Sequence, residues 1–221
     1  MKTLFLIRHG QTEWNLQKRM QGRLDSPLTE TGKAQAGATG KLLKQIAQVD
    51  ALIASPSGRT RETAYIVNSY LRAPLSYDDA LMERDCGEWT GLTFEEIESD
   101  FSQGWRAREN DPYHHRPPGG ENFEDMIARV RDFLDSIFER NLGQIALVTH
   151  AALSRAILTY FLGLAPVQLA KVRHPNDLLY RLHFHPMQIE VSHFVGGDGP
   201  REGLLHHTDS ETISRLDRSD D

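Results

Sequence analysis

Thr3-Leu4-Phe5-Leu6-Ile7-Arg8-His9-Gly10 is the stretch from which we interpret the rest of the chain. Residues 3–7 form an apolar run without glycine or proline, which is typical of a fully buried strand. In open α/β sheets the ligand crevice lies beyond the carboxyl ends of the strands. A cationic Arg8 and a nucleophilic imidazole at His9 therefore lie where chemistry is expected. A lone histidine at a strand end is more often structural than catalytic, so this hypothesis depends on the motifs further along.

The length and charge of the chain limit its class. The chain has 221 residues, which fits one domain with additions or at most two small domains. Its hydrophobic content of 39% and charged content of 25% are normal for a globular protein that buries a core. The formal net charge of −6 argues against nucleic acid or an anionic membrane as the main partner.

The cysteine count and the hydropathy indicate the expected compartment. Cys86 is the single cysteine, so an internal disulfide is excluded and a reducing cytoplasm is expected. No apolar run has the length of a transmembrane helix, and no signal peptide is visible. We therefore expect a cytoplasmic protein that does not bind a membrane.

Several further segments are predicted to belong to the sheet. Residues 51–54 and 145–150 are short apolar runs, and the second ends in a histidine. Residues 75–81 are weakly strand-like. Residues 178–184 and 188–194 alternate apolar and polar side chains, which predicts a hairpin and hence an antiparallel edge.

Helices are predicted between these strands from apolar residues that recur every three or four positions. Thr29 and Asn122 are expected N-caps of two of them. A further helix over residues 151–162 is expected to end near Gly163. The expected buried stripes are Ala34, Ala38, Leu42 and Ile46; Thr60, Ala64, Val67 and Leu71; and Phe123, Met126, Ile127, Val130, Leu134, Ile137 and Phe138.

Together these segments predict a three-layer α/β/α sandwich with a mostly parallel sheet. We expect one domain over residues 1–195. Residues 92–120 mix acidic, aromatic and basic side chains, and we interpret them as a small helical cap, which in enzymes selects substrates and excludes water. Residues 196–221 are rich in glycine and charge and are predicted to be a loosely held tail.

Five motifs follow one another along the chain. They are Arg8-His9-Gly10-Gln11-Thr12-Glu13-Trp14-Asn15, Gln21-Gly22-Arg23-Leu24-Asp25-Ser26-Pro27-Leu28-Thr29, Ser55-Pro56-Ser57-Gly58-Arg59-Thr60-Arg61-Glu62-Thr63-Ala64, Glu83-Arg84-Asp85-Cys86-Gly87-Glu88-Trp89-Thr90-Gly91 and Val148-Thr149-His150-Ala151. In this order they resemble the motifs of the histidine phosphatase superfamily, the phosphoglycerate-mutase-like proteins. The resemblance spans about residues 3–162 and implies a three-layer α/β fold with helices on both faces of the sheet.

The resemblance also implies roles for individual residues. His9 would take the phosphoryl group and Glu83 would donate the proton. Arg8, Arg59 and His150 would stabilise charge on the phosphoryl oxygens, which guanidinium groups match geometrically. These side chains would do the work of a metal, so neither a metal nor another cofactor is expected. The implied substrate-binding residues are Asn15, Gln21, Gly22, Arg84 and Ala151.

Two positions in the motifs need comment. Arg59 is favoured over Arg61 as the second arginine because it lies in the first turn of a predicted helix, from which Arg61 points away. Ala151 stands where the family usually has glycine. Its methyl group could narrow the approach to the phosphate or exclude a backbone with positive φ.

Three functions remain open at this point. We favour a phosphatase for small-molecule phosphate monoesters, because the motifs resemble those of broad-specificity and α-ribazole-phosphate enzymes. The alternative is a cofactor-dependent phosphoglycerate mutase, but such enzymes resemble one another by R-H-Y-G and a longer insertion where this chain has Arg84-Asp85-Cys86-Gly87 and a short cap. The third is a non-catalytic phosphate-binding protein, which the competent side chains at the five catalytic positions disfavour.

Two histidine pairs raise the question of a metal, and the cap raises that of the substrate. Neighbours such as His114 and His115 point apart in regular structure, and no carboxylate or cysteine cluster completes a site with His183 and His185. The expected substrate is a small phosphorylated molecule, and the sequence assigns neither its identity nor an oligomeric state. The arginines that either meet a second anionic group or remain solvated are Arg84, Arg106, Arg108 and Arg116.

Overall fold

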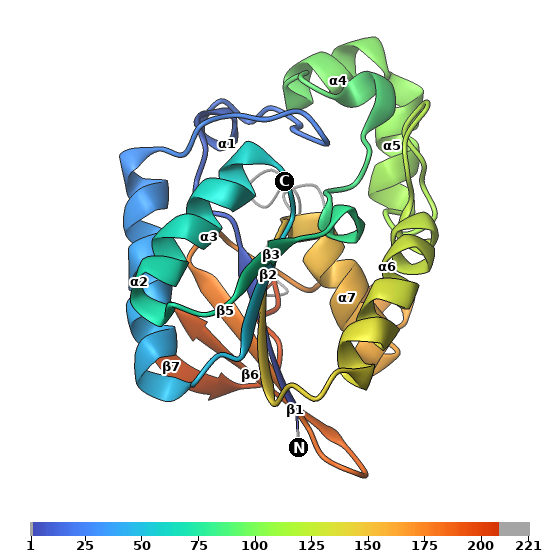
Figure 1. The fold of residues 1–221 in the computed structure, drawn as a ribbon. Coiled ribbons are helices and arrows are strands. Elements are labelled where there is room, and N and C mark those ends of the chain that lie inside the picture. The colour runs from blue at the N-terminus through green and yellow to red at the C-terminus, as the bar shows by residue number, and fades with distance from the viewer. Residues whose placement is uncertain (1, 208–221) are drawn as a thin grey trace.

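Parallel pairing of buried strands places their carboxyl ends along one edge of a single sheet. The computed structural model describes residues 2–207, and within that range seven strands lie in the order β3-β2-β4-β1-β5-β6-β7 (Figure 1). Strands β1 to β4 are parallel, and β5, β6 and β7 extend the sheet in antiparallel pairs. The predicted α/β fold with an antiparallel edge is thus confirmed. The strands are β1 Lys2–Arg8, β2 Ala51–Ala54, β3 Leu75–Tyr77, β4 Gln144–Thr149, β5 Leu178–Phe184, β6 Ile189–Val195 and β7 Asp198–Glu202.

The register of the central strands brings three motifs together. Arg8 at the end of β1 is paired with Thr149 of β4, and Ala54 of β2 is paired with Val148 of β4. The three strands therefore end at nearly the same level. The residues that leave the sheet side by side at this edge are His9, Ser55 and His150.

Helices cover both faces of the sheet (Figure 1). Helices α2 (Glu30–Ile46) and α3 (Gly58–Leu71) pack on one face in one apolar cluster. Helices α6 (Phe123–Glu139) and α7 (Ala151–Leu162) pack on the other face in a second cluster. This arrangement is the predicted three-layer sandwich.

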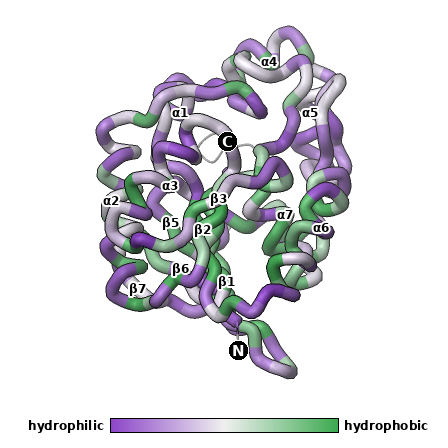
Figure 2. Tube along the Cα trace, in the orientation of Figure 1, coloured by the Kyte–Doolittle hydropathy of each residue, from purple (hydrophilic) through white to green (hydrophobic). Residues whose placement is uncertain are grey.

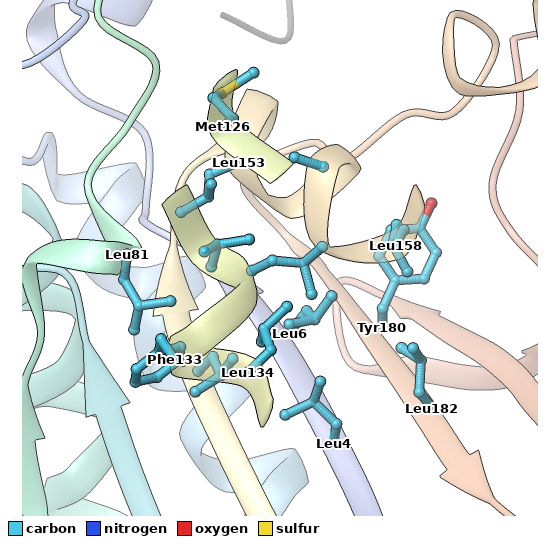
Figure 3. Close-up of a cluster of buried hydrophobic side chains, with 14 of the residues drawn as sticks. Leu4, Leu6, Leu81, Met126, Phe133, Leu134, Leu153, Leu158, Tyr180 and Leu182 are labelled. Carbon is cyan, nitrogen blue, oxygen red and sulfur yellow. The ribbon is translucent and has the colours of Figure 1, made fainter. Parts of the chain in front are cut away.

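The apolar run of β1 is unbroken because both of its faces are buried. Leu4 and Leu6 point into the cluster with α6 and α7, where Figure 3 shows them beside Leu134. Phe5, between them, points into the opposite cluster with α2 and α3. Figure 2 shows the same pattern along the central strands and α7, which are hydrophobic over most of their length.

Side-chain caps fix the ends of several helices as predicted. Thr29 Oγ1 accepts a hydrogen bond from the backbone N–H of Gly32 at 3.0 Å, which begins α2. Asn122 and Asp125 exchange side-chain to backbone hydrogen bonds in a capping box, which begins α6. Gly163 ends α7 in the left-handed conformation, with φ of 62°.

The buried stripe of α2 differs from the prediction. Ala34 and Ile46 are exposed, and the buried residues lie on the neighbouring face of the helix. The reason is close contact with α3, because a Cβ atom at Gly40 would lie 2.6 Å from the Tyr70 ring. Small residues, which the apolar pattern did not include, allow this approach. The buried residues of α2 are Gly32, Ala36, Thr39, Gly40 and Leu43.

Short helices fill the connections. Residues 75–81, predicted as a weak strand, divide into β3 and a 3₁₀ helix because the Asp78 side chain accepts from the N–H of Ala80 at 2.9 Å. The short helices are α1 Glu13–Leu16, η1 Asp79–Leu81, η2 Gly87–Trp89 and α8 Pro166–Leu169.

The segment interpreted as a cap contains helices α4 (Phe94–Asp100) and α5 (Ser102–Asn110), which lie beyond the carboxyl edge of the sheet (Figure 1). Their apolar side chains form a third cluster of their own. Met20 and Cys86 belong to this cluster and connect it to the motif loops. The other buried members are Trp89, Phe94, Ile97 and Trp105.

The prediction of a loosely held tail from residue 196 is wrong for the described part of that segment. Residues 198–202 form β7, which pairs with β6. Beyond it, the backbone N–H of Arg173 donates to Leu205 O at 3.0 Å, and Leu205 packs against the core. Main-chain pairing outweighs the glycine-rich composition here. Residues 208–221 lie outside the described residues, and within residues 2–207 no helix is long and apolar enough to cross a membrane.

Candidate active site

A pocket opens at the carboxyl ends of β1, β2 and β4. Most of the residues that the motifs singled out contribute to its wall. They come from four different loops, which the parallel register of the strands brings together. The lining residues are Arg8, His9, Met20, Gln21, Gly22, Arg59, Glu83, Arg84, Cys86 and Ala152.

His9 is held in one tautomer by its own backbone neighbour. Its Nδ1 lies 2.8 Å from the carbonyl oxygen of Gly10, and a carbonyl only accepts, so Nδ1 carries the proton. The lone pair is therefore on Nε2, on the other side of a ring that lines the pocket. Burial and the positive charges of Arg59 and Arg8 hold the pKa of His9 well below its ordinary value. The neutral form of the imidazole, with its lone pair on Nε2, is therefore favoured.

The backbone around His9 is packed closely enough to require glycine. A Cβ atom at Gly10 would lie 2.2 Å from the carbonyl oxygen of Gly32 in the first turn of α2. The N–H of Gly10 donates to Thr63 Oγ1 at 3.1 Å, which ties the loop to α3. The glycine of the first motif thus has a steric cause.

The two arginines are fully buried and anchored on carbonyl oxygens. Arg8 Nη1 donates to His174 O at 2.8 Å. Arg59, whose side chain is 1% exposed, donates from Nη2 to Gly22 O at 2.9 Å and from Nη1 to Leu24 O at 2.5 Å. Burial lowers the pKa of Arg59, and the charges of Glu83 and Asp25 oppose this. Arg59 therefore fixes the 21–29 loop over the pocket.

The ring of His150 packs against the ring of His9. The two rings meet edge to face, with their centroids 5.4 Å apart. His150 Nε2 is 2.9 Å from Ser55 Oγ, and its Nδ1 is buried without a hydrogen-bond partner among residues 2–207. Burial, followed by the charges of Arg59 and His9, lowers the pKa of His150 well below its ordinary value.

Glu83 reaches the site by docking its carboxylate on the start of α7. Oε1 accepts from the N–H of Leu153 at 3.1 Å and of Arg84 at 2.8 Å, and Oε2 accepts from the N–H of Ala152 at 3.3 Å. Free N–H groups at a helix N-terminus favour such an acceptor. Glu88, in contrast, is exposed, so the spacing in the motif selected the acid that lines the pocket.

Two of the expected substrate-binding residues are placed differently. Asn15 forms a capping box with Thr12 at the start of α1, where its Oδ1 accepts from the N–H of Thr12 at 3.0 Å. Ala151 is the first residue of α7, so its backbone is helical and no positive φ is required. Neither residue is among those that line the pocket, whereas Ala152 is.

The structure adds groups that no motif indicated. His174 is fully buried beside Arg8, and burial together with that charge lowers its pKa to about 3. Asn176 Nδ2 donates to the carbonyl of His9 at 2.8 Å. Both lie between α8 and β5, far along the chain from the motif that they support, and no spacing pattern relates them to it.

Buried cationic side chains continue from the pocket toward the cap. Arg84 and Arg155 both lie over the ring of Phe123, at 6.0 and 5.4 Å from its centroid. Arg108, on α5, is also buried. Burial, followed by the charges of Arg84 and Arg108, lowers the pKa of His115. Of the remaining predicted arginines, Arg106 is exposed and Arg116 pairs with Asp125 at 2.8 Å.

Neither histidine pair belongs to a larger ligand set. His183 and His185 lie on β5 and just beyond it, with ring centroids 4.6 Å apart, and His183 Nδ1 is 2.8 Å from Thr3 Oγ1. Over residues 2–207, no group of three or more histidine, cysteine, aspartate or glutamate side chains could hold a metal ion.

Comparison with known proteins relates this geometry to a family. The sequence model of the histidine phosphatase superfamily (branch 1) matches residues 4–195. A protein of Salmonella choleraesuis named as a probable phosphoglycerate mutase is 30% identical over 220 residues, which cover 99% of this chain and all of that protein. The chain spans about half of the length of mycobacterial relatives that are 33% identical to it, since the match covers 54% of them.

Solved structures are similar over nearly the whole chain. The YhfR protein of Bacillus stearothermophilus superimposes with a TM-score of 0.80 at 32% identity and covers 90% of this chain and 98% of its own. A mycobacterial glucosyl-3-phosphoglycerate phosphatase in complex with VO3 superimposes with a TM-score of 0.78 at 28% identity, over 92% of this chain and 97% of its own.

Proposed function

The chain belongs to the histidine phosphatase superfamily, and we propose that it hydrolyses small-molecule phosphate monoesters through a phosphohistidine on His9. The observation that carries this proposal is the tautomer of His9. Its Nδ1 proton is engaged by Gly10 O, so the Nε2 lone pair is available in a pocket lined by Arg8 and Arg59. A neutral imidazole next to two buried guanidinium groups is suited to attack a phosphate dianion.

In the first step, the Nε2 lone pair of His9 attacks phosphorus. The bond from phosphorus to the ester oxygen breaks, and its electron pair goes to that oxygen. Glu83, in its protonated form, gives its proton to the oxygen, and the alcohol leaves. The products of this step are an alcohol, a phosphoryl group bound to Nε2 and the carboxylate of Glu83.

In the second step, water attacks the phosphorus of phosphohistidine. The carboxylate of Glu83 takes a proton from the water, and the electron pair of the broken N–P bond returns to Nε2 of His9. Inorganic phosphate leaves, and Glu83 is again protonated and His9 again neutral. The docking of Glu83 on the N–H groups of Ala152 and Leu153 supports its carboxylate in this half of the cycle.

Charge on the phosphoryl oxygens is stabilised by side chains in this proposal, without a metal ion. Arg8 and Arg59 line the pocket as buried guanidinium groups, which match phosphoryl oxygens in pairs. The buried Nδ1 of His150, which lacks a partner among residues 2–207, is a third group suited to a phosphoryl oxygen. Gln21, Gly22 and Arg84 line the same pocket and complete the proposed substrate contacts.

The substrate class follows from the cations between the pocket and the cap. We propose monoesters that carry a second anionic group, because Arg84 lines the pocket and two further buried arginines lie near it. Arg155 lies over the same Phe123 ring as Arg84. The charges of Arg84 and Arg108 both act on His115. A mycobacterial structural neighbour is named as a phosphatase of glucosyl-3-phosphoglycerate. Cys86 is the single cysteine of the chain and is buried, which suits a reducing compartment such as the cytoplasm.

A phosphoglycerate mutase is the second candidate, because a relative of the same length carries that name. A mutase returns the phosphoryl group from histidine to an alcohol, whereas a phosphatase gives it to water. The experiment that separates them is a panel of phosphorylated metabolites assayed for inorganic phosphate and for isomerised ester. Release of phosphate without isomerised ester supports the phosphatase. A protein that neither releases phosphate nor forms phosphohistidine with any member of the panel overturns both.

A further inference from the structure

Arg129, on helix α6, holds the backbone of the segment that carries Glu83. Its Nη1 donates to Ala80 O at 2.8 Å, and its Nη2 donates to Met82 O at 3.1 Å and to Glu83 O at 3.4 Å. These carbonyls lie after β3, where the chain has left the sheet. A planar guanidinium is suited to bind several carbonyls at once, which a lysine is not.

Glu121 holds the other side of the same segment. Its Oε2 accepts from the N–H of Asp85 at 2.9 Å, and its own N–H donates to Asp85 O at 2.8 Å. Glu121 also pairs with Arg129, whose Nε lies 2.9 Å from Oε1. Although burial favours its neutral form, the hydrogen bonds from Arg129 and Asp85 hold the pKa of Glu121 below its ordinary value.

We propose that Arg129 and Glu121 form a positioning pair that sets where Glu83 presents its carboxyl group. The pair binds the backbone at residues 80, 82 and 83 on one side of Glu83 and at residue 85 on the other. The carboxylate of Glu83 accepts from the N–H of Arg84 at 2.8 Å, within the backbone that the pair binds, and from the start of α7 at 3.1 and 3.3 Å. A shift of this backbone would therefore move both the attachment point of the Glu83 side chain and one of the donors to its carboxylate. This inference rests on the proposed role of Glu83 as the proton donor.

The partly buried pair Arg129–Glu121 positions Glu83, whereas the more exposed ion pair Arg23–Glu121 does not. The side chains of Arg129 and Glu121 are 21% and 16% exposed. Arg23 reaches Glu121 at 3.0 Å from the loop of the second motif, but its side chain is 42% exposed. Exposed pairs contribute little because water screens them. Arg23 thus adds only a weak contact between the loop of the second motif and Glu121. Arg129 determines the geometry of the backbone around Glu83.

The experiment compares phosphorylation of His9 by two substrates in single-turnover, rapid-quench assays. An alkyl phosphate needs a proton on its leaving oxygen, whereas p-nitrophenyl phosphate hardly does. Arg129→Lys and Glu121→Gln should slow phosphorylation by the alkyl phosphate by about tenfold or more, because a small displacement of a catalytic group is costly. They should slow phosphorylation by p-nitrophenyl phosphate by less than about threefold.

Arg131→Ala is the matched control, since Arg131 lies on the same helix and is exposed, and it should leave both rates unchanged. A second control combines Arg129→Lys with Glu83→Gln. If Arg129 acts through Glu83, the double variant should be no slower with the alkyl phosphate than Glu83→Gln alone. Circular dichroism and the Tm of each variant show whether it is folded. If Arg129→Lys does not fold, the test rests on the conservative variant Glu121→Gln.

The outcomes separate this inference from the proposed function. Equal losses for the two substrates, or losses that multiply in the double variant, overturn the positioning role while the phosphatase remains. A wild-type protein that forms no phosphohistidine overturns the proposed function, and the role of Arg129 with it. Selective loss with the alkyl phosphate that disappears in the Glu83→Gln background supports the inference.

Discussion

The Nδ1 atom of His9 lies 2.8 Å from the carbonyl oxygen of Gly10, the next residue in the chain. The same residue approaches α2 so closely that a side chain at this position would overlap Gly32 O. Gly10 thus packs against α2 while its carbonyl oxygen fixes the tautomer of the neighbouring imidazole. The orientation of the ring that the proposed mechanism requires is therefore set by the adjacent residue.

We predict that His9 carries the phosphoryl group. Rapidly quenched enzyme should contain phosphate that is stable in base and released in acid, and peptide mapping should locate it on His9. His9→Ala should remove both the label and turnover. His114→Ala is the control, because His114 is exposed on the cap side and should keep both. A label on serine, or normal activity of His9→Ala, would contradict the assignment.

Stability should fall as the pH is lowered below about 6.5. Burial, first of all, depresses the pKa of His9, His150 and His174 in the folded protein, the last to about 3. The unfolded chain takes up protons below pH 6.5 that the folded protein does not, so the stabilisation present above that pH is lost as the pH falls. At pH 5.5 the stabilisation lost through His174 alone is about 1.4 kcal/mol, since its pKa of about 3 keeps it neutral in the folded protein.

Urea denaturation at pH 7.5, 6.5 and 5.5 measures this loss. His174→Gln, which cannot take up a proton in either state, should lose less stability over the same interval by about 1.4 kcal/mol. A free energy of unfolding that is constant from pH 7.5 to 5.5 would show that these histidines are not buried in their neutral form.

Turnover should not depend on a metal ion. Arg8 and Arg59 place two buried positive charges in the wall of the pocket, and in the proposed mechanism these charges stabilise the phosphoryl oxygens. Dialysis against EDTA should therefore change the rate by less than about twofold, and vanadate should inhibit as a pentacoordinate mimic of the transferring group. A large loss of activity that Mg²⁺ or Zn²⁺ restores would contradict the proposed mechanism.

How much of this site the sequence could predict depends on whether the contacts are local. His9 and His150 each follow a buried strand and Arg59 lies in the first turn of a helix, so local patterns predicted their positions, whereas Glu83 was proposed from the motif resemblance alone. The α2 stripe was misplaced because Gly40 packs on α3, and such contact has no signature in the hydropathy pattern. The described part of the predicted tail differs for another reason: β7 pairs through its main chain with β6, the strand just before it, and a composition rich in glycine and charge does not reveal such pairing.

Second anionic groups should be recognised through Arg108. The residue is buried on α5, whereas Arg106, one half-turn earlier, is exposed, so Arg106→Ala is a matched control. Arg108→Ala should raise KM by about tenfold for esters with a second carboxylate or phosphate, since a charged hydrogen bond is worth about 1.5–3 kcal/mol. KM for p-nitrophenyl phosphate should change little. An equal rise for both substrates would show that Arg108 only stabilises the cap.

The last prediction concerns Glu83 itself. If Glu83 is the general acid, its contribution depends on the leaving group, because an alkoxide needs the proton and p-nitrophenolate does not. Glu83→Gln keeps the size of the side chain, and its amide oxygen can still accept from Leu153 and Arg84, at the cost of the longer contact to Ala152. The variant cannot donate the proton. It should slow phosphorylation of His9 by alkyl phosphates by about 10²–10⁴-fold, and by p-nitrophenyl phosphate far less.

Single-turnover data are needed for this test, because in the proposed mechanism dephosphorylation also uses Glu83, as the base that activates water. In steady state, a block in the second step would slow both substrates equally and hide the difference. Glu88→Gln is the control, since Glu88 belongs to the same motif but is exposed, and it should behave as wild type. Equal losses for both substrates in the phosphorylation step would mean that Glu83 only supports the start of α7 through its hydrogen bonds, and the proton would then have to come from another group.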